Sequence, residues 1–178
     1  MKTQNSILFL LLIYFVLFAG CENPVDSIEK GICKVNVSGY VTKSYSGEAL
    51  FENVTGPISG KVFFLVLRDI SLPEGQYRFV QFSDSQPEIG IYNLINIEDS
   101  STEGRYIGSY NDSEMYGNYK SIGGKIGITY ASDTEIKGWF DFPAYKNISK
   151  DNGEFERVEI NISGEFYAKE GYTGINLE

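Results

Sequence analysis

The C-terminal part of the chain, residues 124–168, restricts the possible fold more than any other stretch of the sequence. Apolar and polar residues alternate there in three separate runs, at 124–130, 135–142 and 157–168. In the last run, one face carries valine, isoleucine and phenylalanine, and the other carries glutamate, asparagine and serine. Such alternation is typical of a strand with one buried face. We therefore predict three consecutive β-strands, joined by a short turn at 131–134 and by a surface loop at about 146–153.

Two glycines interrupt the apolar faces of these strands. Gly138 lies between Ile136 and Phe140, and Gly164 lies between Ile162 and Phe166. A glycine inside a strand removes a side chain from the packing and costs conformational entropy, so it usually has a local structural reason. A bulge, a bend and room for an aromatic ring from a neighbouring strand are the three reasons that we consider.

The rest of the chain continues the same pattern. Residues 62–67 are continuously apolar, which predicts a strand that is buried on both faces. Arg78 shares a face with Val80 and Phe82. No stretch after residue 31 keeps an apolar helical period for three turns. We expect an all-β fold, a single antiparallel β-sandwich or open barrel of about nine strands, at 35–42, 49–53, 61–67, 77–82, 90–97, 106–110 and the three runs above.

The N-terminus has a different character. A lysine at position 2 precedes an uninterrupted apolar run of 13 residues from Ile7 to Ala19, followed by Gly20 and Cys21. A basic start, an apolar stretch and small residues before a cleavage point are typical of a secretory signal peptide. The run is short of the ~20 residues that cross a bilayer as a helix. We therefore assign residues 1–20 to a signal peptide.

Residues 17–21, Leu-Phe-Ala-Gly-Cys, resemble the lipobox of bacterial lipoproteins. This resemblance implies that Cys21 is acylated, with palmitate among the acyl groups, and becomes the new N-terminus. Residues 21–31 would then be the lipidated cysteine and a polar tether, and residues 32–178 would be the β-domain. That domain also resembles the uncharacterised all-β domains of bacterial lipoproteins. An ordinary signal peptide or an N-terminal membrane anchor are the alternatives.

Charge limits the possible partners. Cleavage before Cys21 would leave 158 residues with 14 basic and 24 acidic side chains, a formal charge of −10. Such a surface argues against nucleic acid and against docking on anionic lipid through a basic patch. The partners that we expect are the lipid bilayer, through Cys21, and an envelope glycan or protein.

The chain contains no histidine. This absence removes Ser-His-Asp and Cys-His catalysis, histidine-ligated zinc and the usual proton shuttle at neutral pH. Cys33 would be the only thiol left after acylation of Cys21, and it reads as a small buried hydrophobe. Carboxylate, Ser-Lys and Tyr-Arg chemistry are the remaining catalytic options, but acidic residues such as Asp69 lie in loops at ordinary density. We expect neither an enzyme nor a cofactor.

Two candidate sites remain. Aromatic residues on a sheet could form a platform for sugar or peptide binding, and the candidates are Tyr106, Tyr110, Tyr116, Tyr119 and Trp139. Packing of these aromatics within a β-protein is the alternative interpretation. A weaker candidate is a calcium site at Asp151, Asn152 and Glu154, where oxygen ligands surround a glycine turn.

The sequence thus predicts a membrane-anchored cell-envelope lipoprotein that acts as a non-enzymatic binding or structural module. A lipocalin-like carrier of a small apolar ligand is the alternative. Glu22 follows Cys21, whereas some bacteria use aspartate at this position to retain lipoproteins in the inner membrane. The outer membrane is therefore the expected location, with the face left open.

Overall fold

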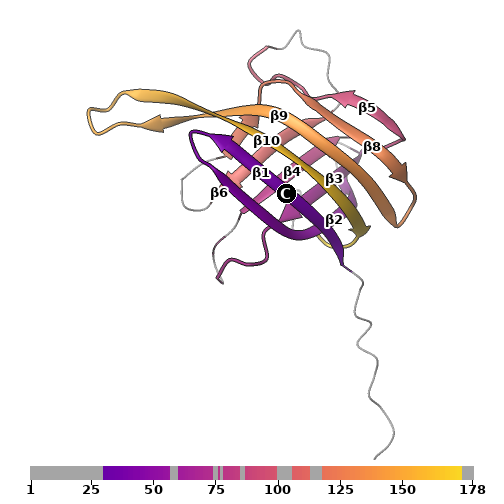
Figure 1. The fold of residues 1–178 in the computed structure, drawn as a ribbon. Helices are drawn as coiled ribbons and strands as arrows, with labels where there is room; N and C mark the ends of the chain where they lie inside the picture. Colours follow the sequence, from indigo (N-terminus) through magenta and orange to yellow (C-terminus); the bar gives the residue numbers. More distant parts are fainter. Residues whose placement is uncertain are drawn as a thin grey trace, which may run out of the picture.

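The computed structural model describes residues 30–56, 60–73, 76, 78–84, 87–99, 106–112 and 118–173. Within these residues the protein is all-β, as predicted, and contains ten strands (Figure 1). No helix in this part of the chain has the length and apolar character needed to cross a bilayer. The predicted signal peptide, Cys21 and most of the tether lie outside the described residues.

The strand bounds differ from the predicted ones in several places. The strands are β1 (Gly31–Gly39), β2 (Lys43–Gly56), β3 (Gly60–Arg68), β4 (Arg78–Asp84), β5 (Gly90–Asn93), β6 (Ile107–Asp112), β7 (Asn118–Ser121), β8 (Lys125–Ala131), β9 (Glu135–Ser149) and β10 (Phe155–Glu170). β7 was not predicted, because its four residues include a single apolar side chain. β2 begins earlier than predicted, at Lys43.

All ten strands belong to one sheet that closes in a ring. The ring follows the pairings β1–β2–β3–β4–β6–β7–β9–β10 and returns from β10 to β1. β10 lies along one edge of β9, and β7 and then β8 lie along its other edge. β5 pairs with β8 and extends the sheet beyond the ring. The strands around the ring are antiparallel, as the prediction required.

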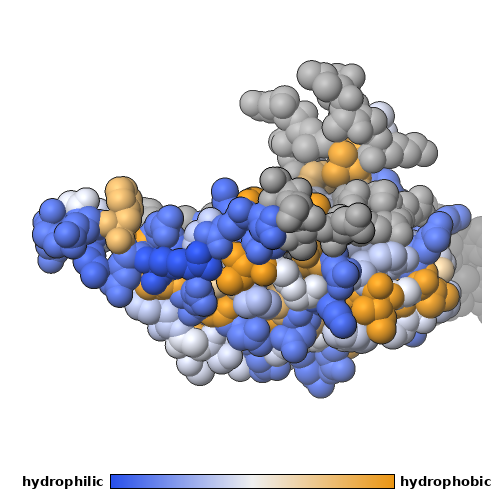
Figure 2. Space-filling model, turned by 90° about the horizontal axis from the view of Figure 1, so that it is seen from above, coloured by the Kyte–Doolittle hydropathy of each residue, from blue (hydrophilic) through white to orange (hydrophobic). Residues whose placement is uncertain are grey.

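β9 and β10 form a long hairpin that projects from the ring (Figure 1). Lys146–Ser149 was predicted to lie in a surface loop, and this prediction is wrong: these residues continue β9 and pair with Phe155–Val158. Asn147 and Ser149 are polar because they are exposed on the projecting ribbon, whereas Lys146 is buried. The surface of the ribbon is mainly hydrophilic (Figure 2), although Phe155 near the end is 75% exposed. The turn itself is confined to a few residues around Gly153.

The core lies inside the ring, where alternation places one face of each strand of the ring. In β10, Val158, Ile160 and Ile162 are buried, and the residues between them are exposed. β3 is buried on both faces as predicted, because Phe64 and Val66, which point away from the ring interior, are also covered. Burial on both sides explains its continuous apolar sequence.

Aromatic rings fill much of the interior. Phe82 contacts Phe140 and Phe142, with ring centroids 5.4 and 5.6 Å apart. Phe63 contacts Phe51 on the neighbouring strand at 5.9 Å and Tyr106 at 6.5 Å. Tilted and edge-on pairs at these distances are the favourable arrangement for aromatic side chains. A closed sheet of about eight strands has an interior just wide enough for side chains to fill.

The ring closes tightly where β1 begins. Gly31 lies between Ala49 of β2 and Tyr167 of β10, and just past this point Leu50 and Lys169 pair directly in parallel. A Cβ atom on Gly31 would lie 2.2 Å from the carbonyl oxygen of Ala49 and 2.4 Å from that of Tyr167. Only a residue without a side chain allows the three backbones to meet here.

Candidate functional site

A groove of about 440 Å³ lies on the outer face of the sheet, over β1, β10 and β9. Alternation along β1 explains its position, because Cys33 and Val35 point into the core while Ile32 and Lys34 point outward. Side chains that line the groove include Ile32, Lys34, Thr129, Lys137, Glu165 and Tyr167. Its volume falls within the range typical of small-ligand sites.

The strand register arranges the groove residues, and the aromatic residues beside the groove, in rows. Tyr130 of β8 lies opposite Lys137 of β9, Lys137 lies opposite Tyr167 of β10, and Tyr167 lies opposite Ile32 of β1. Ile32 is 65% exposed and Tyr130 is 43% exposed. One row across four strands therefore presents an alternation of aromatic, cationic and aliphatic side chains.

The neighbouring row carries charges of both signs beside the only tryptophan. Trp139 lies opposite Glu165, and Glu165 lies opposite Lys34. The Lys34 ammonium is 3.5 Å from the Glu165 carboxylate, and both side chains are largely exposed, so this ion pair contributes little to stability. Trp139 is 36% exposed, and its ring covers Gly127, where a Cβ atom would lie only 2.4 Å away.

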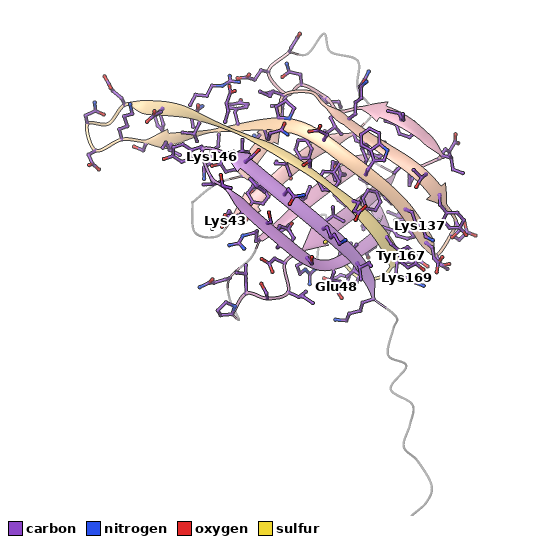
Figure 3. All side chains as sticks on the ribbon, viewed as in Figure 1. Lys43, Glu48, Lys137, Lys146, Tyr167 and Lys169 are labelled. Carbon is purple, nitrogen blue, oxygen red and sulfur yellow. The ribbon has the colours of Figure 1, made fainter. Side chains whose placement is uncertain are left out.

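Tyr167 is surrounded by charged groups at one end of the groove (Figure 3). The ammonium groups of Lys137 and Lys169 lie 4.8 and 5.0 Å from the centre of its ring. Its hydroxyl donates a hydrogen bond to Glu135, which also pairs with Lys169. The hydrogen bond from Lys169 lowers the pKa of Glu135, and the same contact raises the pKa of Lys169.

Lys137 differs from Lys169 in its electrostatic environment. Its ammonium lies 5.5 Å from the ring centre of Tyr130 as well as near Tyr167, so two aromatic faces hold it. Among the residues that the structure describes, Lys137 makes no ion pair, although its charge contributes to the lowered pKa of nearby Glu135, which is bonded to Lys169. The groove therefore contains the Lys137 ammonium, which lies against two aromatic rings and makes no ion pair. The remaining lining of the groove is mainly apolar.

The tyrosine part of the predicted platform is wrong for the residues that can be examined. Tyr106, Tyr110 and Tyr119 are completely buried, because they point into the ring, and Tyr116 lies outside the described residues. Trp139 is exposed on the outer face as predicted. Its aromatic neighbours there are Tyr130 and Tyr167, which sequence reasoning missed. Tyr167 occupies an outward position of the alternating pattern. Tyr130 shares the face of Ile126 and Ile128 in that pattern, and it is exposed because the β8–β9 register shifts between Ile128 and Tyr130.

Tyr110 and Tyr119 belong to a polar cluster inside one end of the ring, whereas Tyr106 packs against Phe63 and Tyr92. The Nη1 atom of Arg78 is 2.7 Å from Asp69 Oδ2, and its Nε atom is 3.7 Å from Asp112 Oδ2. Lys43 Nζ lies 3.2 Å from the same Asp112 oxygen, to which the Tyr110 hydroxyl donates a hydrogen bond of 3.2 Å. Arg78 was predicted to share the face of the core strand residues, and the ion pairs explain how it is accommodated there.

Burial alone would raise the pKa of Asp69. Two hydrogen bonds donated by Ser71, at 2.6 and 2.9 Å, and the nearby Arg78 guanidinium outweigh burial and lower the pKa. The carboxylate is thus held in its charged form by specific donors. These ion pairs stabilise the end of the ring. They are buried, whereas the charged side chains of the groove are exposed to solvent.

Lys146 and Tyr119 complete the cluster. Lys146 points inward from β9 and is buried, with its ammonium 4.6 Å from the centre of the Tyr119 ring. Burial lowers the pKa of Lys146 and raises the pKa of Tyr119 to about 12. The Tyr119 hydroxyl makes no hydrogen bond in the described structure. Figure 3 shows Lys43 and Lys146 at one side of the molecule and Lys137 and Tyr167 at the other.

The predicted calcium candidate lies at the end of the β9–β10 hairpin. Asn152 Nδ2 donates a 2.8 Å hydrogen bond to the Glu154 carboxylate, and Asn152 Oδ1 accepts one from the Glu154 backbone at 3.0 Å. Asp151 is exposed beside them. Within the described residues, no group of three or more histidine, cysteine, aspartate or glutamate side chains could hold a metal ion. These contacts are those of a polar turn.

Cys33 is buried and unpaired with any other cysteine in the described structure, and its thiol lies 3.5 Å from the carbonyl oxygen of Glu48. Burial raises its pKa to about 12. Cys21, the predicted lipidation site, lies outside the described residues.

The fold and groove together define an all-β domain with one ring-closed sheet and an external groove. Comparisons of the chain with protein-family models, with curated proteins and with solved structures found no match.

Proposed function

We propose that the protein is a bacterial lipoprotein, held in the outer membrane by acylated Cys21, whose β-domain is a non-enzymatic binding module of the cell envelope. The observation that carries this proposal is the groove beside Ile32, at the start of the first strand. Cys21 and Gly31 are ten residues apart, and a fully extended tether of that length spans about 35 Å. The groove would therefore face molecules that lie close to the membrane surface.

The packed interior supports external binding over the alternative of a lipocalin-like carrier. Such a carrier needs an open apolar cavity, whereas rings from opposite sides of this sheet meet in the centre, as Phe82 and Phe140 do. Closure of the ring through paired strands also supports the barrel-like form of the expected architecture over two separate packed sheets.

Acylation can be tested directly on the full-length chain produced in a bacterium with lipoprotein processing. Mass spectrometry of the mature N-terminus should show a diacylglyceryl-type adduct on Cys21. Cys21→Ser should release the protein from membranes, and Cys33→Ser, the matched control, should leave it bound. An unmodified Cys21 in the protein isolated from membranes would contradict the anchor.

Binding can be tested on the same detergent-purified protein with a panel of envelope glycans and peptides. Trp139 is the only tryptophan of the chain, so its fluorescence reports on the groove edge. A ligand of the groove should change this signal, and Tyr167→Ala should abolish the change. Tyr40→Ala, at an exposed tyrosine that does not line the groove, is the control. Failure of every compound to bind would contradict the binding function.

A further inference from the structure

We propose that the groove binds an acidic polysaccharide, a chain of sugar rings that carry carboxylates, with Lys137 as the residue that contacts the carboxylate. This inference rests on the proposed binding function and names its ligand class.

Charge is the first argument. The chain as a whole has a formal charge of −9, yet two lysines and one glutamate line the groove, so the site is locally cationic. Lys34 is already paired with Glu165, whereas Lys137 makes no ion pair with any described residue. The charge of Lys137 also acts on Glu135, but that carboxylate is already bonded to Tyr167 and Lys169. A carboxylate that enters the groove would therefore meet a cation that makes no direct ion pair.

The position of Lys137 is the second argument. Its ammonium is held between Tyr130 and Tyr167, and the Thr129 hydroxyl donates a 3.2 Å hydrogen bond to its backbone carbonyl on the adjacent strand. Contacts with two aromatic faces restrict a side chain that is otherwise flexible. Binding to a restricted cation costs less conformational entropy than binding to a mobile one.

The sheet itself argues for a sugar chain and against a peptide strand. An extended peptide usually binds a sheet by hydrogen bonding to an unpaired strand edge. At the groove, β1 is paired with β2 and β10, β10 with β1 and β9, and β9 with β10 and β8. The backbone groups beneath the ligand are therefore already used, and recognition must come from side chains.

Those side chains suit sugar rings. The apolar faces of a sugar can pack on Ile32, which lines the groove, and on the rings of Trp139 and Tyr130 beside it; all three are substantially exposed. Ser46 and Thr129 contribute hydroxyls at the groove lining. The rows of the register extend across four strands, so the surface can accommodate several linked rings.

The test uses the full-length protein in a non-ionic detergent and isothermal titration calorimetry. The probes are a galacturonate hexamer, the same hexamer with its carboxylates methyl-esterified, and a hexaglutamate peptide. We expect the acidic hexamer to bind, with an affinity that falls as salt is raised, and both other probes to bind at least about tenfold more weakly.

Three variants locate the contact. Lys137→Gln should weaken binding of the acidic hexamer about tenfold. Glu165→Gln removes the carboxylate that competes for Lys34 and should tighten binding about threefold, a gain that misfolding cannot produce. Lys120→Gln, at an exposed lysine of β7 outside the groove, should leave affinity unchanged.

The outcomes separate this inference from the function on which it rests. Equal binding of the esterified hexamer would overturn the acidic preference while leaving a glycan-binding groove. Preference for hexaglutamate would overturn the glycan and leave a binding module. Acidic-hexamer binding that neither Lys137→Gln nor Glu165→Gln alters would overturn the assignment to this groove. Absence of binding by any probe or panel compound would contradict the proposed function as well.

Discussion

Phe166 of β10 lies over Gly138, its partner on β9, and a Cβ atom built on Gly138 would be 2.7 Å from the end of the Phe166 ring. The relationship is repeated two residue pairs along the ladder, where Phe140 of β9 lies over Gly164 of β10 at 2.6 Å. Each strand thus provides one glycine and one phenylalanine to the other. This exchange confirms that the glycines make room for aromatic rings from a neighbouring strand.

Replacement of Gly138 by valine should therefore overpack the core. The new side chain would meet Phe166, and its Cβ would also lie 2.2 Å from the carbonyl oxygen of Gly127, so the backbone must move. We expect the free energy of unfolding, measured by urea denaturation, to fall by about 1–3 kcal/mol. Gly171→Ala is the control, because its Cβ would meet only the flexible end of Leu50 at 3.2 Å. Equal stability of Gly138→Val and wild type would contradict the packing argument.

Cys33 should be chemically inert in the folded protein. Its raised pKa of about 12 leaves roughly one thiolate in ten thousand at pH 8, and burial blocks access of reagents. In a full-length Cys21→Ser variant, where Cys33 is the single thiol, iodoacetamide should label it only after urea is added. Mass spectrometry measures the labelled fraction. Labelling of the native protein at the denatured rate would show that β1 opens readily.

The Asp69–Arg78 ion pair should make stability depend on pH in acid. The pKa of Asp69 is lowered on folding, so its contribution is complete above the range where an unfolded carboxyl titrates and is lost as the pH falls through the folded pKa. Asp69→Asn should cost roughly 3 kcal/mol at pH 7, because it leaves Arg78 buried beside one fewer carboxylate. The difference between variant and wild type should shrink below about pH 4.

A matched control for that experiment is Glu165→Gln, which breaks an exposed ion pair. It should change stability by no more than about 0.5 kcal/mol at any pH above 4. A pH-independent gap between Asp69→Asn and wild type would show that the loss has a steric origin.

Two buried tyrosines should respond differently to loss of their hydroxyls. The Tyr45 hydroxyl donates a 2.9 Å hydrogen bond to the carbonyl of Leu67, so Tyr45→Phe should destabilise the protein by about 1 kcal/mol. The Tyr119 hydroxyl is buried without a hydrogen-bond partner in the described structure, so Tyr119→Phe should be neutral or stabilising. Thermal melts of the two variants compare them directly. A larger loss for Tyr119→Phe would indicate that a water molecule satisfies this hydroxyl.

The filled interior leads to a prediction about ligands. Native mass spectrometry of the full-length Cys21→Ser variant should give the mass of the bare chain, and the folded protein should not bind fatty acids or a hydrophobic dye. Stoichiometric lipid, or saturable dye binding that a small apolar molecule displaces, would favour the carrier alternative over the external groove.

Alternation along single strands predicted most elements but not how they combine. The buried face of β10 and the double burial of β3 follow from local patterns, because each depends only on which side chains avoid water. The parallel contact between Leu50 and Lys169 joins strands that are remote in sequence, and no local pattern records it. The continuation of β9 through Lys146–Ser149 was missed for a related reason. Its buried position is occupied by Lys146 and its exposed positions by Asn147 and Ser149, so no apolar alternation marks it.

The candidate site was also predicted only in part, because alternation gives the face of a residue but not its neighbours on other strands. Trp139 occupies an outward position between Gly138 and Phe140, and its exposure follows from alternation. Tyr110 also alternates with polar residues, but its face is decided by the ring that closes around it, and Asp112 on the same face gives a misleading polar signal. The groove combines outward residues of several strands, so only the register could bring Lys137 next to Tyr167.

The enclosed start of β1 has a mechanical consequence. Gly31 lies at the point where β2 and β10 meet, and the strand that follows it is hydrogen-bonded along both edges. In antiparallel pairs these bonds run perpendicular to the strands. A force applied to the chain before Lys30 and directed along β1 would therefore load the bonds of both edges together in shear, not one at a time. In a domain tethered through this strand, a pulling force from the anchor would act on a strand that is hydrogen-bonded to a neighbour on each side.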